Sequence, residues 1–473
     1  MVSFGLIEDW NPRPGNAVTW NASPDAVAAA RQAPIHEVPP SHQQEEYLRS
    51  ARRNASAGYR PSRLCLVSFD FQVPLNRDAM STAVAAFLRR HDTFRSWFSV
   101  EADGTIARHM MDVDDIDVTY RDFGHLDTAA DIREHAQAHT PGPFEWDCFS
   151  FGAIEWDGGF TFYAGVDHLN TDGMSQAMTI VDLMTLYMNA TFGLNNPLAP
   201  VGSYLDYCER ERSVSRQLTR QSPHVERWIE LLSEQGGRLP RFPLPLDNAA
   251  DTHNRSGLRS ASVFDEDSMQ RFEDVCRANG SNMTAGLMAV AALAYSELTG
   301  ERRYLGMTPK STRESGPELN SVGWFTSLIP IPLVVDRDTT FSSAAAQAAD
   351  SYAEGKDLTD VSLHRVLELV EPNDGIDIAP GWSVPMISYV DVRKLPGVEM
   401  FDAINGSLYG SRGSSEEVFL WINRFNDTTQ MTFLYPDTEI AAESIKLYTD
   451  KLIEIMTAVA DKGEYEPVVA ALT

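Results

Sequence analysis

Positive charge is scarce in this chain of 473 residues, which carries 39 Lys and Arg against 67 Asp and Glu and so has a formal net charge of -28. Only six of the basic residues are lysines, and none precedes Lys310. A nucleic-acid binder neutralises phosphates with a basic face, so this balance argues against that class. It also argues against a protein held on anionic lipid by electrostatic attraction.

Cysteines and long apolar runs are scarce as well. The four cysteines, Cys65, Cys148, Cys208 and Cys276, lack metal-ligand or redox spacing, so we expect reduced, mostly buried thiols. The longest apolar stretch, residues 285–295, is far short of the roughly 20 residues that a membrane span needs, and no signal peptide is visible. We therefore expect a cytoplasmic, monomeric protein with no transmembrane segment.

The composition, 43% hydrophobic and 22% charged, is that of a globular protein with a large buried core. Strand and helix patterns are mixed in both halves of the chain, which predicts an α/β (α+β) fold. We expect an N-terminal half at 1–215, a linker at 216–257 and a C-terminal half at 258–473.

Apolar residues at period two predict strands, and those at a 3.6-residue period predict helices. The expected strands are 63–73, 96–100, 106–111, 149–156, 160–166, 258–264, 304–308, 384–390, 418–425 and 431–435. The expected helices are 79–90, 129–139, a long helix after 173, and 265–279, 284–298, 341–355 and 438–460. Asn76 and Asp78 are the expected caps of the first helix.

Three local features add predictions that the structure can test. The charge run at 209–212 indicates a solvated helix face. The Gly-Ser-rich stretch with Gly406, Gly410 and Gly413 indicates a flexible loop. In the last helix, Ile440, Ile445, Leu452 and Ile455 are expected to face inward.

The sharpest motif is Asp-His-Leu-Asn-Thr-Asp-Gly at 167–173, between a predicted strand and a long apolar helix. The turn exposes the imidazole of His168. Asp172 occupies a helix N-terminus, where a carboxylate is favoured, and Gly173 tolerates close backbone approach or an unusual dihedral angle. A neutral imidazole near its ordinary pKa can take a proton from a hydroxyl or amine at pH 7.

Three interpretations of His168 stay open at this point: a general base, a structural histidine satisfied within the turn, or a metal ligand paired with Asp172. The metal pair lacks a nearby third ligand, since Asn170 is a poor one. The sequence contains no G-x-S-x-G nucleophile elbow and no Gly-rich phosphate loop. We therefore expect no covalent enzyme intermediate, no metal and no cofactor.

Other segments strengthen one interpretation. Residues 89–98 read RRHDTFRSWF, residues 41–48 read SHQQEEYL, and residues 322–332 read VGWFTSLIPIP. Together with 167–173 they resemble the superfamily of condensation domains and CoA-dependent acyltransferases, whose motif is H-H-x-x-x-D-G, and the resemblance covers essentially the whole chain. Within it, the chain is most similar to the polyketide-associated protein acyltransferases, which act on trehalose-based glycolipids.

The resemblance implies a role for each motif residue. His168 matches the catalytic His and would be the general base. Asp172 matches the motif Asp, which makes an architectural salt bridge in the family, and Arg95 of the upstream segment is its expected partner. Gly173 would leave room beside the imidazole. Asp167 replaces the first His of the motif, and its carboxylate would either raise the pKa of His168 or point away into the turn.

Two downstream residues take expectations from the same resemblance. Ser327 lies near the position at which family members place a polar side chain close to the tetrahedral intermediate. Its hydroxyl would either stabilise the oxyanion or bond to the strand backbone. Trp324, with Phe325, would form a tunnel or core wall.

The resemblance also implies a fold of two chloramphenicol-acetyltransferase-like halves that form a V-shaped pseudo-dimer with a central tunnel. The implied reaction moves a fatty or polyketide acyl group from a thioester, acyl-CoA or acyl carrier protein, to a hydroxyl of a sugar such as trehalose. Two alternatives are a free-standing condensation enzyme that forms an amide or ester in nonribosomal peptide or polyketide biosynthesis, and a non-catalytic carrier-protein-binding module. An anionic donor needs local positive charge, for which the candidates are Arg49, Arg52, Arg53, Arg89 and Arg90.

Overall fold

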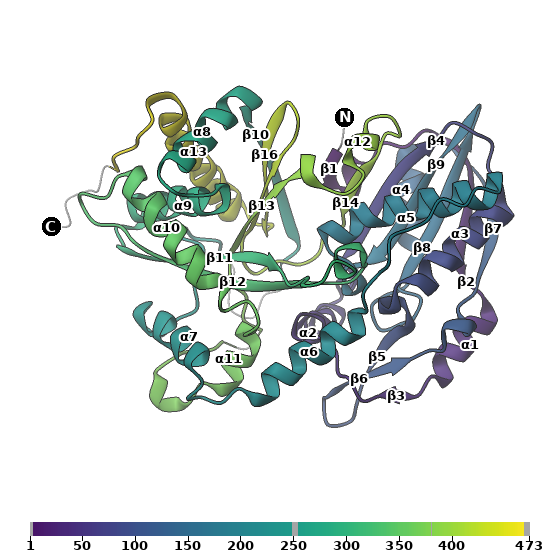
Figure 1. Cartoon of the computed structure of the whole chain (residues 1–473), viewed down its shortest axis with the longest axis horizontal. Coiled ribbons are helices and arrows are strands. Elements are labelled where there is room, and N and C mark those ends of the chain that lie inside the picture. Colours follow the sequence, from purple (N-terminus) through teal and green to yellow (C-terminus); the bar gives the residue numbers. More distant parts are fainter. Residues whose placement is uncertain (1–2, 248–253, 380, 468–473) are drawn as a thin grey trace. The chain divides into compact units, whose positions relative to one another are not determined.

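The computed structural model describes residues 3–247, 254–379 and 381–467. The chain divides into two compact units, whose elements are labelled in Figure 1. Unit 1 comprises Met1–Ser213, Arg313–Phe325 and Lys394–Gly413, and unit 2 comprises Val214–Thr312, Thr326–Arg393 and Ser414–Thr473. Two short segments from late in the sequence thus fold with the N-terminal residues. Both units mix sheets with helices, which confirms the predicted α/β class.

Unit 1 is built on a seven-stranded sheet in the order β1-β14-β4-β9-β8-β2-β7. Its strands are β1 Ser3–Leu6, β2 Gly15–Ala22, β4 Leu64–Phe71, β7 Val118–Leu126, β8 Phe149–Trp156, β9 Gly159–Asp167 and β14 Ser407–Gly410. Neighbouring strands are antiparallel except β1 and β14, which are parallel. Every residue of β9 is buried, so both faces of this central strand are covered.

Helices α3 (Arg77–Arg90) and α5 (Gly173–Phe192) lie against this sheet in Figure 1, and their buried residues are mostly apolar. The helices of unit 1 are α1 Pro24–Gln32, α2 His42–Ser56, α3 Arg77–Arg90, α4 Ala129–Ala138, α5 Gly173–Phe192, the short α12 Val398–Phe401 and the start of α6 Tyr204–Gln217. Asn76 caps α3 by accepting the Ala79 N–H at 3.1 Å, and Asp78 lies within the first turn. A small sheet in the order β3-β6-β5 joins Ile35–His36, Ile106–Met110 and Ser96–Val100.

Unit 2 contains a four-stranded sheet in the order β10-β16-β15-β13 and a hairpin of β11 and β12. The strands are β10 Ser256–Asp265, β11 Arg303–Ser311, β12 Thr326–Val334, β13 Met386–Asp391, β15 Phe419–Arg424 and β16 Thr428–Pro436. The helices are α7 Pro223–Glu234, α8 Glu266–Ala278, α9 Met283–Thr299, α10 Phe341–Lys356, α11 Leu363–Leu369 and α13 Glu439–Lys462. Among the described residues, no helix combines the length and apolar character needed to cross a bilayer.

Glycine permits a close helix contact in the core of unit 2. A Cβ atom at Gly286 of α9 would lie 2.3 Å from the Sγ atom of Cys276 in α8, which is closer than any real contact. The two helices therefore pack at a distance that only glycine allows at this position.

Each strand and helix predicted from the sequence is present, with ends that differ by at most three residues. The prediction of a flexible Gly-Ser loop is wrong, however, for residues 407–410. Ser407–Gly410 forms β14, which pairs with β1 on one side and with β4 on the other. Backbone hydrogen bonds to two neighbours fix this segment, although its composition is typical of loops.

The charge run at 209–212 was wrongly predicted to be a solvated face, because three of its members bond to other elements. The Glu211 carboxylate accepts the His42 N–H at 2.8 Å, and Arg212 pairs with Glu45. Arg210 pairs with Glu318 at 3.1 Å.

Ile440 does not face inward, since 43% of its surface is exposed. The buried face of α13 includes Ile445, Leu452 and Ile455, which are 0%, 2% and 0% exposed. Ile440 precedes Ile445 by five residues, which places it roughly 140° around the helix from that face. The prediction was therefore right for three of the four residues.

Candidate functional site

The motif turn follows the central strand β9 of unit 1. The strand ends at Asp167, a 3-10 turn spans His168–Asn170, and α5 begins at Gly173. Asp172 is the N-cap of α5, and its Oδ1 accepts the Ser175 N–H at 2.8 Å. The strand–turn–helix arrangement predicted from the sequence is confirmed.

Asp172 forms its salt bridge with Arg313 and not with Arg95. The Nη1 and Nη2 atoms of Arg313 lie 2.8 and 3.0 Å from Oδ2 and Oδ1, and the Phe325 N–H donates to Oδ2 at 3.0 Å. The Arg313 side chain is only 1% exposed. Burial alone would raise the pKa of Asp172, but the charge and hydrogen bonds of Arg313 outweigh it and hold that pKa below its usual range. The predicted salt bridge is present, and its predicted partner is wrong.

Arg95 instead braces its own segment, because its Nε donates to the Met111 carbonyl oxygen at 3.2 Å. Two residues earlier, Thr93 donates its hydroxyl hydrogen to the Asn170 Oδ1 at 2.9 Å. The upstream motif therefore reaches the His168 turn through a neutral hydrogen bond and not through the Arg95 charge. Arg313 was missed because it lies 141 positions from Asp172 in the chain, and no local pattern marks it.

The histidine of the upstream motif is structural. The Nδ1 of His91 accepts the Val322 N–H at 3.2 Å, so the proton is on Nε2, which donates to Asp182 at 2.9 Å. Burial lowers the pKa of His91, which keeps the ring neutral. Both nitrogens are thus satisfied inside unit 1.

His168 differs from His91 in its hydrogen bonding. Its ring packs on Trp324 with 4.2 Å between centroids, and its buried Nδ1 has no hydrogen-bond partner in the part of the chain that the structure describes. Burial lowers the pKa of the imidazole to about 4, and the positive charge of Arg63 acts in the same direction. The expectation of an ordinary pKa is therefore wrong, because the ring is desolvated. The ring is neutral at pH 7, although hydrogen bonding to the backbone of His168 and Thr171 partly offsets the lowering of its pKa.

The Asp167 carboxylate points away from the imidazole and into the turn, which confirms one of the two alternatives. It is fully buried, and it accepts the Leu169 N–H at 3.0 Å and the Ser62 hydroxyl at 2.5 Å. Burial raises the pKa of Asp167 to about 6. The residue that replaces the first His of the motif thus holds the backbone of the turn.

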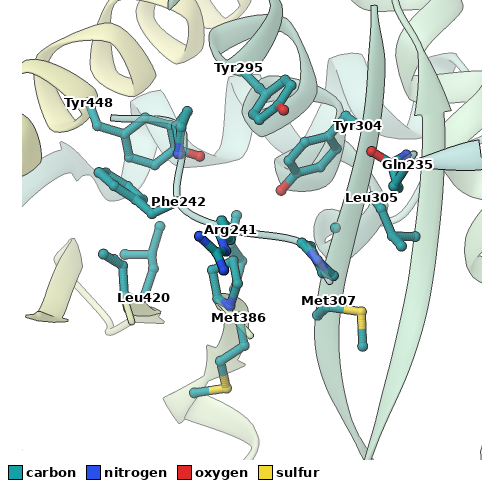
Figure 2. A pocket seen from close by; sticks show the side chains of 16 residues that line it. Gln235, Arg241, Phe242, Tyr295, Tyr304, Leu305, Met307, Met386, Leu420 and Tyr448 are labelled. Carbon is teal, nitrogen blue, oxygen red and sulfur yellow. The ribbon is translucent and has the colours of Figure 1, made fainter. Parts of the chain in front are cut away.

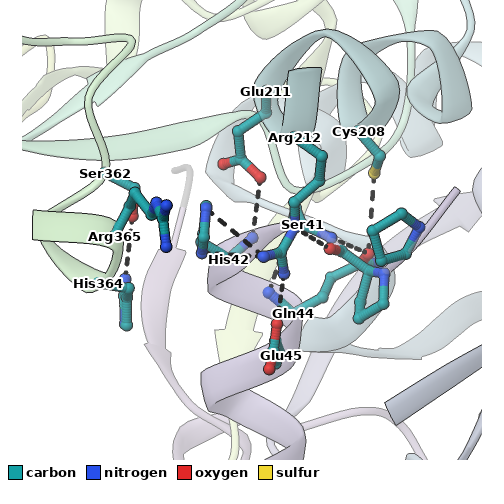
Figure 3. Close-up of polar contacts among 12 residues, drawn as sticks. Ser41, His42, Gln44, Glu45, Cys208, Glu211, Arg212, Ser362, His364 and Arg365 are labelled. Atoms are coloured by element: carbon teal, nitrogen blue, oxygen red, sulfur yellow. Dashed lines mark hydrogen bonds and ion pairs between the residues drawn. The ribbon is translucent and has the colours of Figure 1, made fainter. Parts of the chain in front are cut away.

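Helix α2 braces the same turn from the segment SHQQEEYL. Gln44 donates through Nε2 to the Leu169 carbonyl oxygen at 3.0 Å, and Ser41 caps the helix by accepting the Gln44 N–H. Figure 3 shows this end of α2, with Arg212 from α6 reaching Glu45. The sequence motif therefore contributes support to the backbone next to His168.

The other predicted residues lie as follows. Gly173 has no left-handed φ, and a Cβ atom there would meet no described atom within 4 Å, so neither close approach nor an unusual dihedral explains it. Phe325 is fully buried in the core, while Trp324 is half-buried against His168. Ser327 lies in unit 2 on β12, opposite Lys310 of β11. Ser327 is buried, with 7% of its surface exposed.

A metal is not supported by this turn. Both carboxylate oxygens of Asp172 are occupied by Arg313, which removes that residue as a ligand for His168. In the described ranges, no group of three or more His, Cys, Asp or Glu side chains is arranged to hold a metal ion.

Unit 2 has a mostly apolar pocket of its own, which Figure 2 shows from close by. Its walls include three tyrosines, Tyr295, Tyr304 and Tyr448, and the thioethers of Met307 and Met386. None of the residues predicted from the sequence lines this pocket. It has no group whose chemistry matches that of His168.

Comparison with known proteins identifies the wider group. A family model described as the condensation domain matches residues 62–376. The trehalose-2-sulfate acyltransferase PapA2 of Mycobacterium tuberculosis is 39% identical over 465 residues, which cover 98% of each chain. The 2'-acyl-2-O-sulfo-trehalose (hydroxy)phthioceranyltransferase PapA1 of the same organism is 34% identical over 480 residues, 99% of this chain and 90% of that protein.

Solved structures agree with these sequences. A structure described as PapA2 acyl transferase superposes with a TM-score of 0.89 at 38% identity and covers 97% of this chain and 100% of its own. The condensation domain of the monacolin K polyketide synthase MokA superposes with a TM-score of 0.69 at 16% identity over 90% of this chain and 98% of its own, which supports the fold alone. The family resemblance predicted from the motifs is confirmed.

Proposed function

The chain belongs to the condensation-domain family and is an acyltransferase that acts on a sugar hydroxyl, and we propose that His168 is the general base of this transfer. The observation that carries the proposal is the state of the imidazole. It is neutral, its Nδ1 makes no hydrogen bond to a described residue, and it follows a strand on the motif turn that Asp172 and Arg313 fix. The acceptor we propose is trehalose or a sulfated trehalose, and the donor is a fatty or polyketide acyl thioester.

The proposed reaction is a direct transfer. The imidazole takes the proton of the acceptor hydroxyl as its oxygen attacks the thioester carbonyl carbon, which becomes tetrahedral with a negative oxygen. The C–S bond then breaks, the carbonyl re-forms as an ester, and the leaving thiolate takes the proton from the imidazolium. Atoms and charges balance without a cofactor, a metal or a covalent acyl-enzyme.

The buried pair of Asp172 and Arg313 has a positioning role in this proposal. Asp172 caps α5 through Ser175, and it also binds the backbone of Phe325, next to the Trp324 ring that packs on His168. The pair therefore fixes the turn and its aromatic neighbour together, which holds the imidazole in one orientation.

The test is acyl transfer by a His168→Ala variant, measured by mass spectrometry of the ester formed from acyl-CoA and trehalose or trehalose-2-sulfate. We expect kcat to fall by about a hundredfold to ten-thousandfold, because that is the usual contribution of a general base. His125→Ala is the matched control, since that histidine is 56% exposed and lies on β7. Near-normal turnover by a folded His168→Ala enzyme would contradict the assignment.

The same assay separates the remaining alternatives. A condensation enzyme for peptide or polyketide products would require a carrier-protein donor and would form an amide or ester with its own acceptor. A non-catalytic module would bind a carrier protein and turn over no thioester. We propose that the enzyme works as a monomer in the cytoplasm, which sedimentation and cell fractionation test.

A further inference from the structure

Arg63 is the residue that faces His168 across the end of the sheet. The β4–β9 ladder ends with Leu64 opposite Asp167, and the His168 N–H continues it by donating to the Arg63 carbonyl oxygen at 2.8 Å. Opposite residues of an antiparallel pair project from the same face, with Cβ atoms about 4.5–5.5 Å apart. Arg63 and His168 lie just beyond this ladder, opposite each other.

The Arg63 guanidinium is unpaired within unit 1. It is half-buried, and it makes no hydrogen bond or ion pair with a described residue of that unit. Other arginines of unit 1 have partners: Arg60 donates to two backbone carbonyls, Arg313 pairs with Asp172, and Arg412 forms an ion pair with Glu8. In a chain with far more acidic than basic residues, an arginine without a carboxylate beside a catalytic turn indicates a place for an external anion.

The surroundings of Arg63 suit a sugar that carries such an anion. The backbone N–H of Arg63 donates to the Tyr47 hydroxyl at 2.8 Å. The centroid of the Tyr47 ring lies 5.7 Å from that of Trp324, whose ring packs on His168. On another side stands Gly413, where a Cβ atom would lie 3.5 Å from the Arg63 Nε. Because Gly413 has no side chain, it does not cover the guanidinium. The two aromatic rings beside this site are those of Tyr47 and Trp324, and Trp324 packs on His168. The guanidinium fork matches the oxygens of a tetrahedral anion, which it can bind bidentately.

We propose that Arg63 binds the sulfate ester of a sulfated trehalose acceptor. This inference rests on the proposed function, because it assigns a residue to the acceptor of that reaction. A phosphate of the donor has the same anion chemistry. The acceptor is favoured because Arg63 is opposite the base, and the base must meet the acceptor hydroxyl.

A bound sulfate would also change the base. The charge of Arg63 helps to lower the pKa of His168 from its ordinary value. An anion on Arg63 neutralises that charge, so the imidazole becomes more basic when the sulfated acceptor is present. The residue thus couples recognition of the acceptor to removal of its proton.

The central experiment compares Arg63→Gln with the wild type on trehalose-2-sulfate and on trehalose. A hydrogen bond to a charged group contributes enough that we expect KM for trehalose-2-sulfate to rise about tenfold to hundredfold. KM for trehalose should change less than about threefold. Arg337→Gln is the matched control, because Arg337 is exposed in a turn of unit 2. Equal changes for both acceptors would overturn the proposal.

Two further arms identify the source of the anion and separate this inference from the catalytic one. Acyl-CoA is replaced by an acyl-pantetheine without phosphates; if the Arg63→Gln defect disappears with that donor, the anion belongs to the donor and the sulfate assignment is wrong. Calorimetric binding of trehalose-2-sulfate needs no turnover. We expect His168→Ala to bind it like the wild type and Arg63→Gln to bind it more weakly. Equal binding by both variants would overturn the proposal even if the wild type proves inactive.

The pH profile gives a readout that a merely structural role would not move. Without the Arg63 charge, the pKa of His168 rises toward 6.5, so the acidic limb of kcat/KM for unsulfated trehalose should shift to higher pH in Arg63→Gln. Arg63→Lys keeps the charge, so the acidic limb of its kcat/KM profile should lie at the same pH as that of the wild type. A limb that does not move in Arg63→Gln would contradict the coupling.

Discussion

Two arginines contact the same turn in opposite states. Arg313 is buried, and its guanidinium bonds to both oxygens of Asp172, to the Ser175 hydroxyl and to backbone carbonyls. Arg63 is half-buried beside His168, and within the described residues of unit 1 its guanidinium meets no carboxylate. The comparison separates two uses of scarce positive charge: one arginine has its whole hydrogen-bonding capacity committed to the fold, and the other has it available.

The two carboxylates of the turn show the same contrast. The pKa of Asp172 lies below its usual range because Arg313 offsets burial, whereas burial raises the pKa of Asp167 to about 6 because its main partners are neutral donors. The two residues are five positions apart in the sequence. Their protonation behaviour is therefore set by what the fold brings to each, not by their shared motif.

We expect the largest difference between the two arginines when the guanidinium of each is removed by substitution. Arg313→Ala leaves Asp172 buried and unpaired, so we expect the free energy of unfolding to fall by about 3–5 kcal/mol. Arg63→Gln removes no ion pair of unit 1 and should change it by less than about 1 kcal/mol. Urea denaturation of both variants measures the difference. Equal losses would show that Arg63 is also committed to the fold.

The pH dependence of stability tests the two ionisable neighbours, Asp167 and His168. Asp167 has a folded pKa of about 6 against an ordinary 3.8, so the folded state holds its proton longer and stability falls as pH rises through that window. His168 has a folded pKa of about 4 against 6.5, so its contribution rises with pH over an overlapping window. The two contributions oppose each other in the wild type.

Single variants should expose each contribution. In His168→Ala, only the contribution of Asp167 to the pH dependence of stability remains. Between pH 4 and 6 the unfolding free energy of this variant should therefore fall with rising pH relative to the wild type. In Asp167→Asn, only the contribution of His168 remains, so the unfolding free energy of this variant should rise with pH relative to the wild type. Chemical denaturation at a series of pH values measures both slopes. Parallel slopes in the two variants would contradict the assigned directions.

The sequence predicted the parts of this fold that local chemistry determines. The Asn76 cap and the strand–turn–helix around His168 each depend on neighbours within a few residues. The family motif then indicated which histidine matters, and the unbonded Nδ1 of His168 distinguishes it from the satisfied His91.

The parts that were missed depend on contacts between distant segments. Arg313 bonds to Asp172 across 141 positions, and β14 becomes a strand only because β1 and β4 flank it. Glu211 looked solvated because the backbone of α2 that it binds lies 169 positions away. Composition describes a segment alone, whereas hydrogen-bond satisfaction belongs to the assembled fold.

Lysine substitutions give the smallest and most selective test of the comparison, because they keep the charge and change only its geometry. Arg313→Lys loses the bidentate fork and the bonds to Ser175 and the carbonyls, so we expect a loss of about 1–3 kcal/mol in unfolding free energy. Arg63→Lys should stay within about 0.5 kcal/mol of the wild type. It should also keep part of the preference for trehalose-2-sulfate over trehalose, since an ammonium still attracts sulfate as a point charge. Urea denaturation measures the stability of both variants, and KM measurements give the preference for trehalose-2-sulfate. If Arg313→Lys is as stable as Arg63→Lys, the geometry of the pair with Asp172 is not what fixes the turn, and charge alone suffices.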